Sequence, residues 1–346
     1  MDLAFLVGAA TIVGIYYLLA AGVNLQYGVS GVLNLGVHGI FAVGAYGYGM
    51  LTQPPGSSTA FALGLPWPVA AVVAVLAASL VSVVLVVPAL LVDSRIRSPY
   101  LAPIVTLAAA ETLVVLLSSN NDVAGGFAGL FGVPQPLSSI ASALGPSGFA
   151  WVYLALVLAV GVLVTWLSVR LRNSPFGLLA RSARDDEVEV QSLGFNPVRY
   201  QYWSMAIGGG MMGLAGVAWA GYLTTLQPSG FTINETLLVL IAVIAGGRGS
   251  IAGCVVGSVV VFGLLNQATR LLPSEWLASV PGVRQILLGV VLVLLLRYRP
   301  TGVIPDRPRR YGRALRRLEE RQLSRETASV GGPSPTNLDR SGGRRR

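Results

Sequence analysis

Polar side chains that could do chemistry lie inside the apolar stretches of this 346-residue chain. Asn34 and His38 lie in the second stretch, Glu111 in the fourth, and Asn266 beside Gln267 in the eighth. Burying such groups without partners costs several kcal/mol, so they usually face a cavity or a bonding partner. We predict that a polar pathway is lined by residues drawn from Asn34, His38, Glu111 and Asn266. A structural carboxyl at Glu111 and a packing histidine at His38 are the alternatives.

The ionisable residues also exclude several kinds of chemistry. All 24 basic residues are arginines, and the absence of lysine excludes a Walker A phosphate-binding loop and a Schiff-base cofactor site. The chain has one histidine and one cysteine, Cys254, which leaves no zinc cluster, no disulfide framework and no conventional serine–histidine or cysteine–histidine pairing outside the membrane. We therefore predict a protein that is not an enzyme, with no catalytic residue, no metal site and no cofactor of its own. Any ATP chemistry would belong to another subunit.

The composition indicates an integral membrane protein. Hydrophobic residues make up 53% of the chain and charged residues 11%, whereas soluble domains are roughly 25% charged. A helix that crosses a bilayer needs about 20 mostly apolar residues. Runs of this kind lie at 3–23, 31–52, 67–92, 98–118, 150–169, 200–223, 233–247, 251–270 and 283–297. We predict an all-α polytopic membrane helix bundle in residues 1–300, with about nine transmembrane helices and a range of eight to ten.

The distribution of arginine predicts the orientation. The tail from Arg297 to Arg346 holds 14 arginines and five acids, so it carries the whole net charge of +9. With nine crossings, 22 of the 24 arginines lie on one side, which the positive-inside rule identifies as the cytoplasm. We expect the C-terminus inside, the N-terminus outside and an outer loop at 119–149. Residues 301–346 are expected to form a basic, largely disordered tail that attracts anionic membrane lipid and not nucleic acid.

Glycine is abundant, and many of the 42 glycines lie inside apolar runs, where they let helix backbones approach closely. A spacing of four residues recurs in the sixth run and at the start of the eighth. We predict helix packing at Gly209, Gly213, Gly249, Gly253 and Gly257. This spacing is common in membrane bundles, so it indicates tight packing and does not identify a substrate.

One charged segment lies in the body of the chain, between the fifth and sixth runs. Ser174 is a suitable N-cap, the following proline suits a first helical turn, and Gly194 followed by Pro197 suits a helix end. Apolar residues recur at helical spacing along it, beside a dense surface of mixed charge. We predict an amphipathic cytoplasmic helix at about 174–196, either a solvated connector or a docking element for a cytosolic partner.

Several blocks of the sequence resemble one family. The blocks are GVNLQYGVSGVLNLGVHGIFAVGAY from Gly22, ARSARDDEVEVQSLGFNPVRYQYW from Ala180, GLAGVAWAGYLTTLQPSGFTINETLLVLIAVIAGGRGSIAGCVVGS from Gly213, and RPTGVIP from Arg299. Together they are similar to the permease subunits of branched-chain amino acid ABC importers, of the LivM type and not the LivH type. The resemblance covers most of the chain, from about Gly22 to Pro305, and its specificity comes from the joint occurrence of the blocks.

The resemblance implies an ABC importer permease fold in a bacterial plasma (inner) membrane. It implies half of a translocation pathway, paired with a homologous LivH-type permease, two cytosolic ATPases that bind ATP and Mg, and an extracytoplasmic substrate-binding protein. The charged segment would be the coupling helix, seated in a groove on an ATPase. The positions assigned to this ATPase coupling are Arg181, Arg184, Asp185, Asp186, Glu187 and Gly194. The GGRGS turn at 246–250 would be a second contact or a tight helix break.

The sequence departs from the family pattern in two places. Val188, Glu189 and Val190 stand where the family commonly has small alanines, and Arg248 stands inside the glycine turn where an apolar residue is usual. Both departures affect the expected contact surface for the ATPase. Related permeases carry urea, short amides and other amino acids, so these are alternative cargoes. A stand-alone secondary transporter or channel is the alternative function, suggested by Glu111 and the glycine-rich spans.

Overall fold

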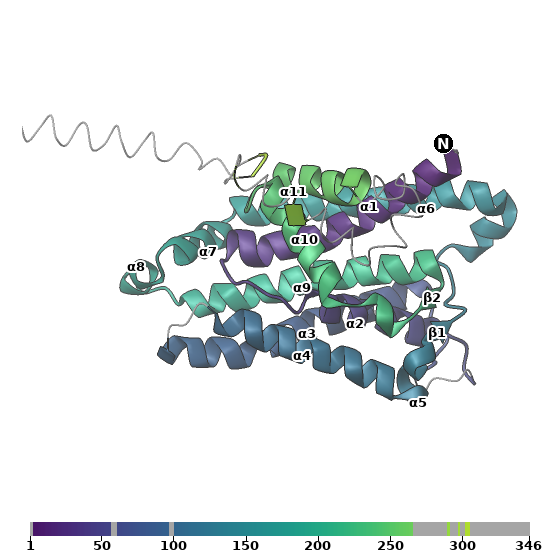
Figure 1. Ribbon diagram of the computed structural model, residues 1–346, viewed down its shortest axis with the longest axis horizontal. Helices are drawn as coiled ribbons and strands as arrows, with labels where there is room; N and C mark the ends of the chain where they lie inside the picture. The colour runs from purple at the N-terminus through teal and green to yellow at the C-terminus, as the bar shows by residue number, and fades with distance from the viewer. Residues whose placement is uncertain are drawn as a thin grey trace, which may run out of the picture. The chain divides into compact units, whose positions relative to one another are not determined.

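Helices make up most of the described chain, and the long ones run side by side (Figure 1). The computed structural model describes residues 3–56, 61–96, 100–265, 289–290, 297 and 302–304. Of the predicted features, Asn266, most of the ninth apolar run and nearly all of the tail at 301–346 lie outside these residues.

The elements of the described chain are α1 (Leu3–Val23), η1 (Asn24–Val29), α2 (Val37–Thr52), α3 (Trp67–Ile96), α4 (Leu101–Ser119), α5 (Asn121–Ala124), η2 (Gly126–Ala128), β1 (Leu130–Phe131), α6 (Ser138–Asn173), α7 (Pro175–Asp185), α8 (Glu187–Ser192), α9 (Pro197–Leu223), β2 (Thr225–Leu226), η3 (Pro228–Gly230), α10 (Ile233–Gly246), α11 (Ile251–Ser258) and η4 (Val259–Leu265). η1 and η4 are π-helical, whereas η2 and η3 are single 3₁₀ turns. α6 is interrupted at Gly145, whose φ is +70°.

Six helical segments of the described residues are long and apolar enough to cross a membrane. They are Leu3–Val29, Trp67–Leu90, Leu101–Ser119, Gly148–Asn173, Pro197–Leu223 and Pro228–Gly246. Each overlaps one of the predicted runs, in agreement with an all-α polytopic bundle, but the count of nine is not confirmed. The second run is shorter than predicted, because α2 has 16 residues and the chain before it is not helical.

The central helix of the bundle is α9, because its glycines let three other helices approach it. Gly209 and Gly213 face α3, Gly208 faces α1, and Gly216 faces the backbone of α2. A Cβ atom on any of these glycines would collide with a neighbouring helix. The close contacts predicted from glycine spacing in the sixth run are therefore present at Gly209 and Gly213. Both glycines pack against α3.

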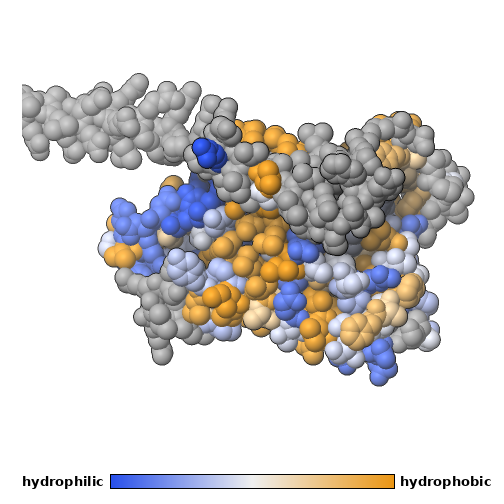
Figure 2. Space-filling view, in the orientation of Figure 1, coloured by the Kyte–Doolittle hydropathy of each residue, from blue (hydrophilic) through white to orange (hydrophobic). Residues whose placement is uncertain are grey.

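The two ends of the bundle differ in structure and polarity. One end holds the N-terminus, α5 and the antiparallel pair β1–β2, in which Leu130 pairs with Leu226 (Figure 1). The other end holds α7 and α8. Figure 2 shows hydrophobic residues across the middle of the visible face and hydrophilic residues gathered around α7 and α8. The segment predicted as an outer loop at 119–149 is folded, since it contains α5, η2, β1 and the start of α6.

The core includes a cluster of aromatic rings between α1, α9 and η4. Tyr16 stacks on Phe262 with the ring centres 4.0 Å apart, and it meets Trp219 edge to face at 5.7 Å. The Tyr16 hydroxyl donates a hydrogen bond to Glu235 at 2.7 Å, so the polar end of the ring has a partner. The first turn of α10, which carries Glu235, is thereby fixed against α1.

Candidate functional site

The charged segment forms two short helices, α7 and α8, where a single helix at 174–196 was predicted. The start agrees with the prediction, because the Ser174 hydroxyl accepts a hydrogen bond from the Gly177 amide at 3.3 Å and a proline follows. The end also agrees, because the segment turns at Gly194, whose φ of +84° suits glycine. The break between the helices lies at Asp186.

Asp186 ends α7 and caps α8. Its backbone is extended, with φ −150° and ψ 106°, which interrupts the helix. Its carboxylate accepts hydrogen bonds from the amides of Val188 at 2.9 Å and Glu189 at 3.0 Å. Aspartate is favoured at such a position because it satisfies amides that the first helical turn leaves free. The Asp186 carboxylate, which was assigned to ATPase coupling, therefore binds backbone amides of its own segment.

The outer side of this segment is an exposed surface of acids and large apolar side chains. Small residues of α7, including Ala180 and Ala183, are buried against the bundle. We name as the α7–α8 surface six of its exposed residues, namely Leu178, Asp185, Glu187, Val188, Leu193 and Phe195. Leu193 is the most exposed of its large apolar side chains, at 67%. Contiguous exposed apolar surface rimmed by charge is typical of a protein contact.

Two arginines on the inner side of α7 bind main-chain carbonyls of other elements. Arg181 donates a hydrogen bond to the carbonyl of Arg172 at 2.8 Å, near the end of α6. Arg184 donates to the carbonyl of Gly28 in η1, and also to the Asp185 carboxylate at 2.9 Å. These two predicted coupling residues therefore tie α7 to the ends of α6 and η1.

The turn between α10 and α11 reaches the same part of η1. Arg248 lies over the ring of Tyr27, with its Cζ 4.0 Å from the ring centre, and donates to the Tyr27 carbonyl at 3.3 Å. Burial lowers the pKa of Arg248, and the positive charge of Arg184 acts in the same direction. Arg184 and Arg248 are therefore neighbours at the end of η1.

Asn24 fixes the backbone of this turn. Its Oδ1 accepts a hydrogen bond from the Gly249 amide at 2.8 Å, and its Nδ2 donates to the Ser250 carbonyl at 3.4 Å. Gly249 has a φ of +79°, and a Cβ on Gly28 would lie 2.6 Å from the Gly249 nitrogen. Both positions therefore require glycine for η1 and the turn to approach each other.

The remaining packing glycines lie in α11. A Cβ on Gly253 would lie 2.8 Å from the carbonyl carbon of Gly246, and one on Gly257 would lie 3.1 Å from the Cα of Gly246. α10 and α11 therefore pack closely just beyond the turn. Gly249, predicted with them as a helix-packing residue, lies in the turn and contacts η1 instead.

Residues 302–304, the last described segment of the chain, contact the end of α10 and the turn at 246–250. The amides of Val303 and Ile304 donate hydrogen bonds to the carbonyls of Ala245 at 2.8 Å and Gly246 at 2.9 Å. Gly302 has a φ of +82° and approaches the turn so closely that a Cβ would lie 2.5 Å from the Cα of Gly247. We name as the junction the four segments that meet here, namely η1, α7, the turn at 246–250 and residues 302–304.

Buried polar side chains continue from the junction into the bundle. Gln26 of η1 is fully buried, and its Nε2 donates to the Ser82 hydroxyl of α3 and to the Met205 carbonyl of α9, each at 3.1 Å. Its Oε1 accepts a hydrogen bond from Asn34 Nδ2 at 3.0 Å. One glutamine therefore connects η1 with α3, α9 and the chain that leads to α2.

The chain between η1 and α2 is not helical, so Asn34 does not lie in the same helix as His38, as the predicted run would place it. Asn34 Oδ1 accepts a hydrogen bond from the Gly36 amide at 2.7 Å, and the Thr106 hydroxyl of α4 accepts one from the intervening amide at 3.2 Å. These side chains replace the backbone bonds that a helix would have made. Asn34 thus organises the lead-in to α2.

His38 and Glu111 are brought together farther inside the bundle. His38 is fully buried, and its amide and Nδ1 lie 3.1 and 2.9 Å from the Thr236 hydroxyl of α10. Its Nε2 lies 3.4 Å from Glu111 Oε1, and the Glu111 side chain is 49% exposed. Of the predicted pathway residues, His38 and Glu111 therefore meet, Asn34 lies apart from them, and Asn266 lies outside the described residues.

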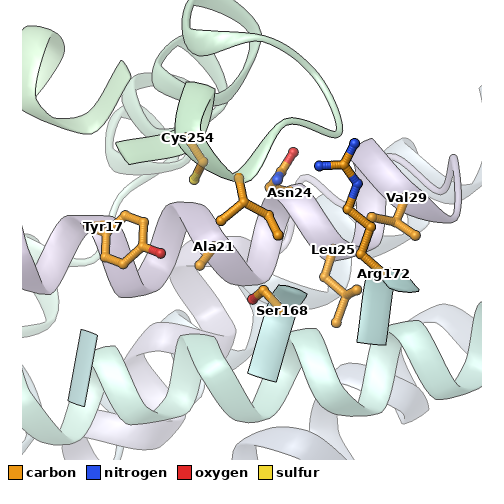
Figure 3. A pocket seen from close by; sticks show the side chains of 9 residues that line it. Tyr17, Ala21, Asn24, Leu25, Val29, Ser168, Arg172 and Cys254 are labelled. Atoms are coloured by element: carbon orange, nitrogen blue, oxygen red, sulfur yellow. The ribbon is translucent and has the colours of Figure 1, made fainter. Parts of the chain in front are cut away.

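A narrow cleft lies beside the junction, between α1, α6 and α11 (Figure 3). Its lining includes Tyr17, Asn24, Ser168, Arg172 and Cys254. The buried Ser168 hydroxyl has no hydrogen-bond partner among the residues that the structure describes. The cleft has room for about one water molecule. It is therefore too small to be a passage for an amino acid.

Several residues of this site were missed by reasoning from the sequence, namely Asn24, Gln26, Tyr27 and Thr236. The signal for the first two was present, because they are polar residues next to an apolar run. The predicted span ended at residue 23, whereas the helical segment continues to Val29. Thr236 gave no signal, since threonine often bonds its own helix backbone in apolar spans.

The sequence of this chain is similar to those of known membrane transport proteins. Residues 5–296 match a family model described as branched-chain amino acid transport system / permease component. The high-affinity branched-chain amino acid transport system permease protein LivM of Escherichia coli K12 is 31% identical over 86% of this chain and 70% of its own length. The probable LivM protein of Methanocaldococcus jannaschii is 27% identical over 85% and 92%. A LivH permease of Salmonella typhimurium is 27% identical over 40% and 42%, and no solved structure matches significantly.

Proposed function

This chain belongs to the branched-chain amino acid transport permease family and is of the LivM type, and on that premise we propose that it is the permease subunit of an ATP-driven ABC importer. The family consists of transport components and not of enzymes. In the proposed importer the chain forms half of the translocation pathway for branched-chain amino acids or related small amino acids. Urea and short amides are the alternative cargoes.

The proposed importer contains four other subunits around this chain. Two cytosolic ATPases supply ATP and Mg binding, and an extracytoplasmic binding protein delivers the substrate. A second, LivH-type permease supplies the other half of the pathway, and the partial similarity of this chain to LivH permeases supports a partner of related fold. The α7–α8 end then faces the cytoplasm of a bacterial cell, the N-terminus lies outside, and the chain is a multi-pass protein of the inner membrane.

The junction is the observation that carries the proposal. The α7–α8 surface offers acids and large apolar side chains to a partner, and Arg184 bonds the same helix pair to η1. η1 in turn holds the 246–250 turn through Asn24, and α3 and α9 through Gln26. A force applied to α7 by a closing ATPase dimer would therefore reach several membrane-spanning helices as a rigid-body displacement.

The test begins with the full-length chain purified from its native membrane in mild detergent. Co-purification of ATPase subunits and a second permease, followed by ATP-dependent uptake of leucine, isoleucine or valine in membrane vesicles, is the expected result. Uptake that needs an ion gradient and no ATPase would replace the proposal with a secondary transporter. ATP-dependent uptake of urea or short amides, without uptake of these amino acids, would change the cargo and keep the mechanism.

A matched pair of variants then tests the docking surface. Leu193→Arg places a charge in the α7–α8 surface and is expected to prevent association with the ATPases. Phe127→Arg changes a side chain that is 84% exposed in η2, directly after α5 and so far from α7 and α8, and it should leave that association unchanged. Equal ATPase recovery with both variants would show that α7 and α8 do not form the contact.

A further inference from the structure

Glu111 occupies an unusual position for a carboxylate. It lies about 15 Å from one end of α4 and about 12 Å from the other, at 1.5 Å per residue, which is the middle of a membrane-spanning helix. Its side chain is nevertheless 49% exposed. A charged carboxylate facing lipid at this depth costs about 3 kcal/mol or more, so the outer face of α4 borders water or protein in the membrane.

The exposed face of α4 around Glu111 is mostly apolar. Ile104, Ala108, Thr112 and Val115 are exposed with it at helical spacing along α4. Within the described part of the chain, no arginine forms an ion pair with Glu111. The arginines whose contacts the structure describes lie at helix ends and in the turn, away from the middle of α4. Any cation that pairs with this carboxylate would therefore come from outside the described side chains.

On the buried side of Glu111, hydrogen bonds hold His38 and close packing holds α4 against α2. The Thr236 hydroxyl accepts a hydrogen bond from the His38 amide and lies 2.9 Å from His38 Nδ1, and the backbone of Leu35 also bonds the imidazole. His38 Nε2 is buried, lies 3.4 Å from Glu111 Oε1, and makes no hydrogen bond with any described residue. Ala110 packs so tightly on Gly39 that a Cβ there would lie 2.7 Å from the alanine Cβ, which fixes α4 against α2.

We propose that Glu111, backed by His38, binds the ammonium group of an amino acid as it passes through the translocation pathway. The carboxylate would accept hydrogen bonds from the ammonium on its exposed side, while the imidazole steadies the oxygen on its buried side. Ile104, Ala108 and Val115 offer apolar surface beside it for an aliphatic side chain. This inference rests on the proposed function, because it needs a cargo that carries an ammonium group.

The test uses cysteine accessibility in membrane vesicles that contain the whole transporter. Cys254 is the single cysteine of the chain, so Cys254→Ala gives a cysteine-free parent. ATP-dependent leucine uptake by this parent is measured first, and its absence would count against the proposed function and not against the site. Ala108→Cys, which is exposed one turn from Glu111 on the same face of α4 and leaves the carboxylate in place, is then introduced and treated with a water-soluble, cationic methanethiosulfonate reagent, with and without excess leucine.

The expected result is that Ala108→Cys reacts, and that leucine slows the reaction about tenfold at a concentration ten times its Kd. Val162→Cys on α6 is the control, since it lies at a similar depth in an exposed stripe with Leu158 and Trp166 and should stay unreactive in lipid. An unreactive Ala108→Cys would place this face of α4 against lipid or another subunit and overturn the proposal. Reaction without protection by leucine would also overturn it, because water would then reach a site that the substrate does not occupy.

Transport kinetics give a second, independent reading. Glu111→Gln keeps the shape and loses the charge, and it is expected to raise the KM for leucine uptake about tenfold, the effect of losing a charge-assisted hydrogen bond. Glu111→Asp keeps the charge and should retain a KM closer to that of the parent. An unchanged KM in Glu111→Gln, in protein that inserts and assembles normally, would overturn the proposal even if the cysteine reacts.

Discussion

The Arg184 guanidinium donates a hydrogen bond to the main-chain carbonyl of Gly28, a residue 156 positions earlier in the chain. This bond joins α7 to the end of the first membrane-spanning segment, next to the residue whose carbonyl receives Arg248. A displacement of α7 must therefore move η1 or break the bond. The pair is a direct link from α7 to the interior of the bundle.

Replacing Arg184 with alanine should uncouple ATP hydrolysis from uptake. A hydrogen bond from a charged donor contributes about 1.5–3 kcal/mol, so its loss should reduce ATP-dependent uptake about tenfold or more while the ATPases continue to turn over. Arg199→Ala is the matched control, because Arg199 is an exposed arginine at the start of α9. The measurement is uptake and phosphate release in the same vesicles, and equal ratios in both variants would remove the role of Arg184.

Asp186 allows capping to be separated from a charge contact. Asp186→Asn keeps an oxygen that can accept the Val188 and Glu189 amides, whereas Asp186→Ala loses it and should destabilise α8 by about 1 kcal/mol. Hydrogen exchange of the α8 amides should therefore speed up in the alanine variant and stay near the parent rate in the asparagine variant. Loss of transport in Asp186→Asn with normal α8 protection would instead indicate that the negative charge contacts a partner.

Gly253 should tolerate no side chain. Even alanine would place its Cβ 2.8 Å from the Gly246 carbonyl carbon and 3.0 Å from the Ile304 oxygen, so α10, α11 or residues 302–304 must shift. Overpacking of this kind typically costs about 1–3 kcal/mol, and a lower melting temperature in detergent is expected. Gly230→Ala is the control, since a Cβ there meets nothing within 4 Å. Equal melting temperatures would show that the α10–α11 contact is looser than the structure has it.

Gln26 is expected to matter for stability as well as for coupling. Gln26→Met has nearly the same shape but leaves the Asn34 amide without its acceptor in a buried site, at a cost of about 1–3 kcal/mol. Gln227→Met changes an exposed glutamine and should have little effect. Thermal unfolding of the two purified variants distinguishes these outcomes. A Gln26→Met protein as stable as the parent would mean that water or a rearranged Asn34 replaces the bond.

Features set by neighbouring residues were predictable from the sequence. The six membrane-spanning segments lie where length and hydrophobicity placed them. The charged segment begins at Ser174 and turns at Gly194, because caps depend on residues within one helical turn. The break at Asp186 follows the same local rule, since an aspartate three residues before Glu189 is a capping signal. One helix was predicted instead because apolar residues recur at helical spacing on both sides of Asp186.

Contacts between distant segments could not be predicted in this way. Asn24 binds the Gly249 amide 225 residues away, and no spacing in the sequence indicates that pair. The meeting of His38 with Glu111 depends on how α2 packs against α4, which is decided by three-dimensional fit. The non-helical chain before α2 was missed for a different reason, because its residues are as apolar as those of a membrane helix and only its hydrogen bonds differ.

The arginines of the junction have a further electrostatic consequence. The carbonyls that receive Arg181, Arg184 and Arg248 belong to the last residues of α6 and η1, where a helix presents the negative end of its dipole. Three guanidinium groups therefore neutralise helix ends that would otherwise repel one another where they converge. In the proposed orientation, the positive charges that mark the cytoplasmic side for membrane insertion are also the charges that allow the helices to close together there.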